Sequence, residues 1–268
     1  MTEQAVIKPE SRSALAWGIR DSLVLIKRSM MHIIKSPDQL LAAAFQPIMF
    51  MLLFRYVFGG AIETGGTTYV NFLVAGILVQ TAGFGSTMTA IAVATDLQKG
   101  IVDRFRSLPM MGSALLIGHT VSDLARNAIS ASVMIGVGLL VGFRPTASFV
   151  EWLGIASTLL LFTFAFSWLS AIMGMVAKSP EAVQWISFVF IFPLTFASSA
   201  FVPTEGMVPV LKAFAVNQPV THVIEAIRSF MVGTPLGNHA WLAVIWCLGI
   251  LAVCIPLSTV LFRRRTSR

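Results

Sequence analysis

The sequence predicts an all-α, polytopic membrane protein with six transmembrane helices. The prediction rests on the composition, on the long stretches between charged residues and on the placement of the basic residues. Of the 268 residues, 56% are hydrophobic and only 12% are charged. A soluble globular protein carries about 25% charged residues, and half that share cannot cover the surface of one. The composition therefore excludes an ordinary soluble domain and a disordered chain.

Six stretches between charged residues are apolar enough to cross a bilayer, which takes about 20 mostly apolar residues per helix. No internal repeat, low-complexity tract or linker separates them, so residues 1–268 are expected to form a single transmembrane domain. The spans are expected near residues 40–58, 70–94, 115–142, 152–176, 182–202 and 240–262.

The basic residues predict the orientation, because Lys and Arg are retained on the cytoplasmic side. With both termini in the cytoplasm, external segments hold only Arg144, Lys212 and Arg228. The net charge of +7 is thus a signal of topology and indicates no nucleic-acid partner. The first 38 residues are too charged for a signal peptide. We expect the first span to act as its own insertion signal, as in a multi-pass protein of the bacterial inner (plasma) membrane. The basic residues on the cytoplasmic side are Lys8, Arg12, Arg20, Lys27, Arg28, Lys35, Lys99, Arg104, Arg106, Lys178, Arg263, Arg264, Arg265 and Arg268.

Residues 14–36 precede the first span and have apolar positions at nearly helical spacing. Basic residues, among them Arg20, Lys27 and Arg28, fall largely on the other side. Such a basic amphipathic helix is typical of a segment that lies in the cytoplasmic membrane interface. The alternative is a cytosolic helix that packs on the spans.

Residues 96–112 form the main cytoplasmic loop, in which charged and apolar residues alternate at helical spacing until Pro109. The pattern predicts a short helix with an exposed apolar stripe. That stripe either folds back on the membrane or binds a cytosolic partner in the manner of an amphipathic helix in a groove.

Residues 203–232 lie between the fifth and sixth spans on the external side, and three prolines interrupt this apolar segment. Neither side of Pro219 is long enough to span. We expect two re-entrant half-helices in the outer leaflet, because irregular backbone at that depth must be buried in protein. Glu225 and Arg228 are three residues apart and are expected to form a structural ion pair on one helix face.

Polar groups are sparse within the spans. Asp123 and Arg126 in the third span have the same three-residue spacing, which favours an ion pair, with a proton relay as the alternative for intramembrane charges. Hydroxyls at Thr195, Ser198 and Ser199 follow a proline in the fifth span. They either bond backbone carbonyls or line a polar path.

The sequence lacks the motifs of an enzyme that works alone. It contains no G-x-x-x-x-G-K-[ST] phosphate loop and no H-E-x-x-H metal motif. Ionisable residues near the middle of most spans, which secondary transporters use, are missing as well. We therefore expect a non-enzymatic permease without a cofactor of its own, which takes its energy through a cytosolic surface.

Several stretches, in order along nearly the whole chain, resemble the type-2 ATP-binding-cassette (ABC) export permeases, in particular the daunorubicin/doxorubicin-resistance branch. Together they are specific to that branch. The matching stretches are PDQLLAAAFQPIMFMLLFRYVFGGAI (37–62), YVNFLVAGILVQTAGFGS (69–86), DLQKGIVDRFRSLPM (96–110), FPLTFASSAFVP (192–203) and NQPVTHVIEAIRSFMVG (217–233).

The resemblance implies a permease dimer that works with two copies of a cytosolic nucleotide-binding subunit, which would hold the ATP and Mg. The second permease would be an identical chain or a related one. The substrate would be a drug, polyketide or lipid that moves outward between the first, second and fifth spans. Residues 14–36 would also touch the ATPase, and residues 203–232 would be re-entrant helices at the external mouth. The residues that match the coupling helix of the family are Lys99, Gly100, Asp103, Arg104, Arg106 and Pro109.

One residue departs from the family pattern, and two other functions stay open. Arg55, near the external end of the first span, stands where relatives usually have an uncharged residue. Within transport, the alternative is a permease for lipid-linked polysaccharide. Outside transport, it is a membrane-embedded assembly or sensor protein whose partner is not an ATPase.

Overall fold

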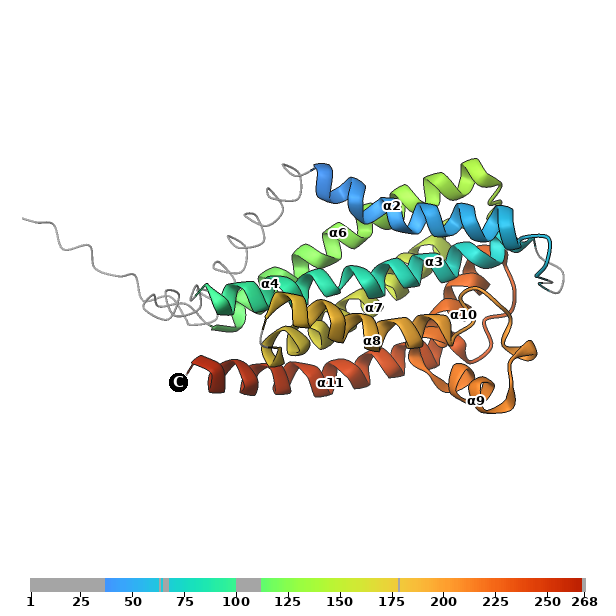
Figure 1. Ribbon diagram of the computed structural model, residues 1–268. Coiled ribbons are helices and arrows are strands. Elements are labelled where there is room, and N and C mark those ends of the chain that lie inside the picture. Colours follow the sequence, from blue (N-terminus) through green and yellow to red (C-terminus); the bar gives the residue numbers. More distant parts are fainter. Residues whose placement is uncertain (1–36, 63, 65–67, 100–111, 178, 267–268) are drawn as a thin grey trace, which may run out of the picture.

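The computed structural model describes residues 37–62, 64, 68–99, 112–177 and 179–266, and these contain helices and no strand (Figure 1). The predicted all-α class is confirmed for this part of the chain. The helical elements are α2 (Pro37–Leu53), the π-helical turn η1 (Phe54–Phe58), α3 (Tyr69–Gly85), α4 (Thr87–Gln98), α6 (Gly112–Val141), α7 (Phe149–Val176), α8 (Pro180–Phe196), the 3-10 turn η2 (Thr204–Gly206), α9 (Pro209–Asn217), α10 (Pro219–Val232) and α11 (His239–Thr266).

Each of the six predicted spans overlaps a helix. Within the described residues, four helical stretches are long and apolar enough to cross a membrane, and two further apolar stretches are shorter. The shorter ones, Phe45–Phe58 and Pro180–Phe196, fall on the first and fifth predicted spans. The long ones are Tyr69–Gln98, Leu116–Val141, Phe149–Val176 and His239–Phe262.

Helix α8, the fifth predicted span, ends at Phe196 and not near residue 202 as predicted. Residues 197–202 form turns. Carbonyl groups at this point are bound by side chains from distant helices. The Gln218 side chain donates hydrogen bonds to Leu194 O at 2.6 Å and to Ala197 O at 3.0 Å. The Tyr69 hydroxyl donates one to Phe201 O at 3.0 Å. Because these contacts satisfy the carbonyls, the helix can end inside the protein without leaving them unpaired.

Helix α3 lies at the centre of the bundle. Most of its residues are buried, including the whole run from Phe72 to Gln80. Helices α2, α6, α7, α8 and α10 all contact it. A helix that is hydrophobic on all sides is normally buried. Helix α3 is almost entirely apolar in sequence, and its burial agrees with that composition.

Helices α7 and α11 pack along each other, and α10 contacts both (Figure 1). In Figure 1, α9 and α10 lie at the end of the bundle opposite to the C-terminus. Local signals fix the helix ends here: Ser148 and Glu151 form a capping box at the start of α7. Gly233 ends α10 with a φ of 71°, a conformation that glycine adopts at little cost.

Two glycines allow helices to approach closely. A Cβ atom on Gly174 of α7 would lie 2.3 Å from Ala90 O of α4. A Cβ atom on Gly76 of α3 would lie 2.1 Å from Ala200 O. Both neighbours are backbone atoms, so neither contact can be relieved by turning a side chain.

We expect Gly174→Ala to lower the thermal unfolding temperature of the detergent-purified chain, because it forces α4 and α7 apart at a cost of about 1–3 kcal/mol. Gly249→Ala on α11 is the matched control, because a Cβ atom there meets nothing within 4 Å. Alanine has a greater helix propensity than glycine, so Gly249→Ala should leave the unfolding temperature equal to that of the wild type or higher. Equal destabilisation by the two variants would contradict the close packing of α4 and α7.

Candidate functional site

A polar cluster lies near the middle of α6 and is centred on Asp123, whose side chain is fully buried. The carboxylate accepts hydrogen bonds from Arg126 and from Asn127 Nδ2, the latter at 3.0 Å. Ser167 of α7 donates a further hydrogen bond to its second oxygen. The expected partners Asp123 and Arg126 are thus brought together, and helix α7 is tied to the same carboxylate.

The cluster continues to the break between α3 and α4. Arg126 Nη2 donates a hydrogen bond to Gly85 O, the last residue of α3, at 3.1 Å. Ser86, between the two helices, lies with its hydroxyl 2.8 Å from the hydroxyl of Ser170 on α7. A Cβ atom on Gly85 would lie 2.3 Å from Asn127 Oδ1, so a larger residue at this position would displace the Asn127 amide from its place beside Asp123.

This arrangement favours the ion-pair interpretation of Asp123 and Arg126 over the proton relay. Both oxygens of the carboxylate are occupied by donors, and the guanidinium bonds a helix carbonyl as well as the carboxylate. A buried charge pair is tolerated only when its remaining hydrogen-bonding groups are satisfied in this way.

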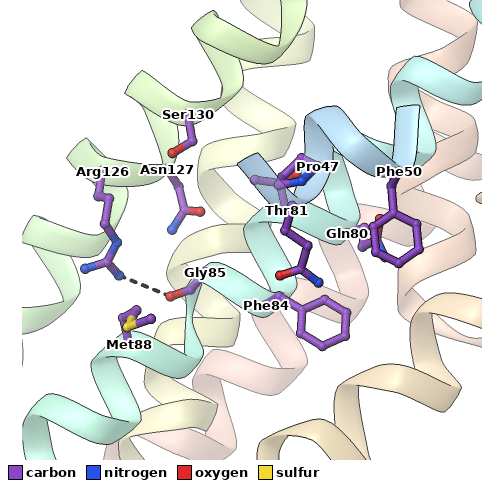
Figure 2. A pocket seen from close by; sticks show the side chains of 11 residues that line it. Pro47, Phe50, Gln80, Thr81, Phe84, Gly85, Met88, Arg126, Asn127 and Ser130 are labelled. Atoms are coloured by element: carbon purple, nitrogen blue, oxygen red, sulfur yellow. Dashed lines mark hydrogen bonds between the residues drawn. The ribbon is translucent and has the colours of Figure 1, made fainter. Parts of the chain in front are cut away.

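A cavity of about 390 Å³ adjoins the cluster, between α2, the α3–α4 break and α6 (Figure 2). Its size is within the range of ligand sites. Figure 2 shows Arg126, Asn127 and Ser130 on one side, opposite Phe84 and Met88. The polar lining residues are Gln46, Gln80, Thr81, Arg126, Asn127 and Ser130, and the others are Pro47, Phe50, Phe84, Gly85 and Met88.

Gln80 lines this cavity with an unpaired amide. The residue is 4% exposed, and its enclosed Nε2 has no hydrogen-bond partner among the described residues. Buried amides are normally paired, because an unpaired buried donor costs about 1–3 kcal/mol. Gln80 Nε2 is therefore an unpaired donor that is enclosed beside the cavity and does not open onto it.

A second polar cluster joins α10 to the central helix. Arg228 donates to Glu225, as expected, and also through Nη2 to Ser199 O at 2.6 Å. Its Nε and Nη2 reach Phe72 O at 3.3 and 3.2 Å, and the guanidinium lies 3.6 Å from the centre of the Phe72 ring. One side chain thus holds α10, α3 and the turns after α8 together.

The two histidines near this end form a close pair. Nδ1 of His222 on α10 lies 3.1 Å from Nδ1 of His239 at the start of α11. Burial lowers the pKa of His222 below its ordinary value, and the neighbouring His239 lowers it further. The contact links two helices, and no group of metal ligands forms around it among the described residues.

Most of the residues predicted to contact an ATPase lie outside the described residues: Gly100, Asp103, Arg104, Arg106 and Pro109 of the loop, and Arg20, Lys27 and Arg28 of the helix at 14–36. Lys99 is described and is exposed directly after α4. In the last turn of α4, Asp96 Oδ2 lies 2.8 Å from His119 Nε2 of α6. This contact joins the two helices that lead into and out of the loop.

The cavity and the α3–α4 break were missed by sequence reasoning. Gln80 interrupts an apolar run, and that was the one available signal for the cavity. The hydroxyls of Thr195 and Ser198, left open above, donate to the carbonyls of Ile191 and Thr195. This outcome supports a backbone-bonding role for both.

The fold and these clusters define the class of the chain: an all-helical, multi-pass membrane protein with polar groups buried between its spans, as in transport proteins. The chain belongs to the ABC-2 type transporter family, which matches residues 21–232.

Curated relatives extend the similarity over nearly the whole chain. It is 33% identical over 264 residues to the "Daunorubicin resistance ABC transporter permease protein DrrB1" of Streptomyces coeruleorubidus, covering 98% of this chain and 93% of that protein. It is 25% identical to the "Probable doxorubicin resistance ABC transporter permease protein DrrC" of Mycobacterium tuberculosis H37Rv, covering 97% and 94%. It is 26% identical to "Nodulation protein J" of Rhizobium leguminosarum bv. viciae, covering 76% and 78%.

We expect Asp123→Ala to be more destabilising than the double variant Asp123→Leu with Arg126→Met. The single change leaves the partly buried Arg126 guanidinium without its carboxylate, a loss of up to about 3 kcal/mol, whereas the double change removes both charges. The measurement is the thermal unfolding temperature in mild detergent. Ser132→Ala serves as the control, because this exposed hydroxyl of α6 bonds only its own helix. A double variant as unstable as the single one would show that the ion pair is not what these residues contribute.

Proposed function

We propose that this chain is the permease subunit of an ABC exporter that moves a hydrophobic or amphipathic compound outward across the bacterial inner membrane. The observation that carries the proposal is its similarity, over nearly its full length, to a permease named for daunorubicin resistance. Drugs, polyketides and lipids are the substrate classes to test first. The ATP and Mg belong to a separate nucleotide-binding subunit, since the chain has no phosphate loop of its own.

In this proposal the chain crosses the membrane six times. The spans are α2 with η1, α3 with α4, α6, α7, α8 and α11. An even number of spans keeps both termini on one side, and the excess of Lys and Arg favours the cytoplasm. Helix α10 supports a re-entrant hairpin with α9: its 14 residues rise only about 21 Å, and most of them are buried in the protein.

The loop at 96–110 is proposed as the coupling helix to the ATPase. The Asp96–His119 contact supports this role, because it joins the helices that flank the loop just before and after it. A displacement of the loop would therefore move α4 and α6 together. Through Arg126 and Gly85, α6 is tied to the α3–α4 break in the middle of the bundle.

A second permease, identical or related, is proposed to complete the transport path. Apolar side chains on the outer face of α8 support this, since Trp185 is 70% and Val189 is 68% exposed. On α2, Phe45 is 66% exposed.

The mechanism follows from these parts. ATP binding closes the pair of nucleotide-binding subunits and pulls on the two coupling helices. The permease halves shift against each other, and the path between the first, second and fifth spans opens to the outside. The compound then leaves from the inner leaflet or the cytosol toward the external side.

The double variant Arg104→Glu with Arg106→Glu should abolish export and leave membrane insertion intact, because it reverses the charge of the proposed coupling helix. The assay is daunorubicin efflux from cells that co-express the partner ATPase, with insertion followed by accessibility labelling of single cysteines. Lys212→Glu, on α9 at the opposite end, is the control for charge reversal. Normal efflux by the double variant would contradict the coupling assignment.

A further inference from the structure

The two neighbouring histidines connect helix α10 to helix α11. His222 lies near the start of α10 and is buried, whereas His239 is the first residue of α11 and is partly exposed. Their Nδ1 atoms are 3.1 Å apart, and their ring centres are 5.4 Å apart. Among the described residues, no other hydrogen bond between side chains joins these two helices. The segment 233–238 between the helices is exposed throughout, so the pair holds the start of α11 against the start of α10.

The number of protons on the pair decides whether the contact can exist. When both rings are neutral, one Nδ1 donates its hydrogen and the other Nδ1 accepts it. One added proton leaves this bond in place, because a cationic ring can donate to a neutral one. A second added proton puts a hydrogen on both Nδ1 atoms, so no acceptor remains and two positive charges face each other. The contact therefore tolerates one added proton and breaks with the second.

The surroundings of His222 oppose its protonation. Burial lowers the pKa of His222, His239 lowers it further, and Glu225 acts in the opposite direction. Glu225 is already paired with Arg228 on the same helix. A histidine whose pKa is lowered in the folded protein stabilises the fold above its ordinary range, and this stabilisation is lost as the pH falls. Acid therefore weakens the contact.

Few other ionisable groups lie on the elements around the pair. Helices α3, α7, α9 and α11 pack against α10, and α11 also contacts α6. Helix α6 carries no charged residue after Arg126, and α11 carries none before Arg263. The remaining ionisable residues are Tyr69 of α3, Arg144 of the turn before α7, Glu151 of α7 and Lys212 of α9. The first three each bond residues other than the pair, and Lys212 is exposed.

We propose that the His222–His239 pair is an acid-sensitive latch, which holds α10 against the start of α11 and releases it when both imidazoles are protonated. Helix α10 lies at the end of the bundle opposite to the C-terminus (Figure 1). In the topology proposed above this is the external end, so an acidic exterior would release the latch. The inference rests on the proposed function for this choice of side alone.

The test is hydrogen–deuterium exchange of the purified full chain in mild detergent, read by mass spectrometry of peptides from residues 219–242. Wild type and His239→Asn are compared at about pH 7.5 and at about pH 5, the range in which histidine titrates. The Asn amide can donate or accept and stays uncharged at both pH values. The two proteins should exchange alike at neutral pH. At acid pH the wild type should exchange roughly three- to tenfold faster, the factor that one hydrogen bond contributes.

His222→Asn is the second variant, because it removes the other ring that can be charged, and it should also abolish the acid-induced increase. His119→Asn is the matched control, because His119 contacts Asp96 on another pair of helices. This control should exchange like the wild type over residues 219–242 at both pH values.

Exchange at acid pH that is equal in the wild type, His239→Asn and His222→Asn would overturn the inference. An acid-induced increase in His119→Asn that is abolished as in the other two variants would overturn it as well. The measurement contains no ATPase and no transported compound. A missing ATPase partner would therefore contradict the proposed function without affecting this result.

Discussion

Polar groups inside a bilayer must find partners within the protein, and this requirement organises the structure around Asp123. Water is absent from the hydrocarbon core, so an unpaired charge or backbone group there costs several kcal/mol. The buried carboxylate is met by Arg126, Asn127 and Ser167, and Arg126 in turn bonds the carbonyl at the end of α3. The carboxylate thus joins α6 to α7, and its partner Arg126 joins α6 to the α3–α4 break.

The same requirement explains the opposite end of the bundle. The chain leaves helix α8 early, and its free carbonyls are bound by Gln218, Arg228 and Tyr69 from other helices. Arg228 also stacks on Phe72 and pairs with Glu225. Irregular backbone is stable here because it is buried in protein and its polar groups are paired, and α9 and α10 are positioned by these contacts.

Sequence reasoning located every apolar helix and both i,i+3 ion pairs, because hydropathy and helical spacing are local properties. It misplaced the end of α8, since that end depends on Gln218, 24 residues after the carbonyl of Leu194 that it binds. It also missed the cavity at Gln80, because residues of four helices, α2, α3, α4 and α6, line it together. Local patterns predict elements, whereas long-range contacts decide where elements stop and what they enclose.

The central claim is that this permease obtains its energy from a separate ATPase. The most direct measurement is a mild-detergent pull-down of the tagged chain from its native host, followed by an ATPase assay of the isolated complex. The account predicts a stoichiometric nucleotide-binding protein whose ATPase activity depends on this chain. A chain that elutes alone, or with a partner that has no ATPase activity, would contradict it and favour an assembly or sensor protein.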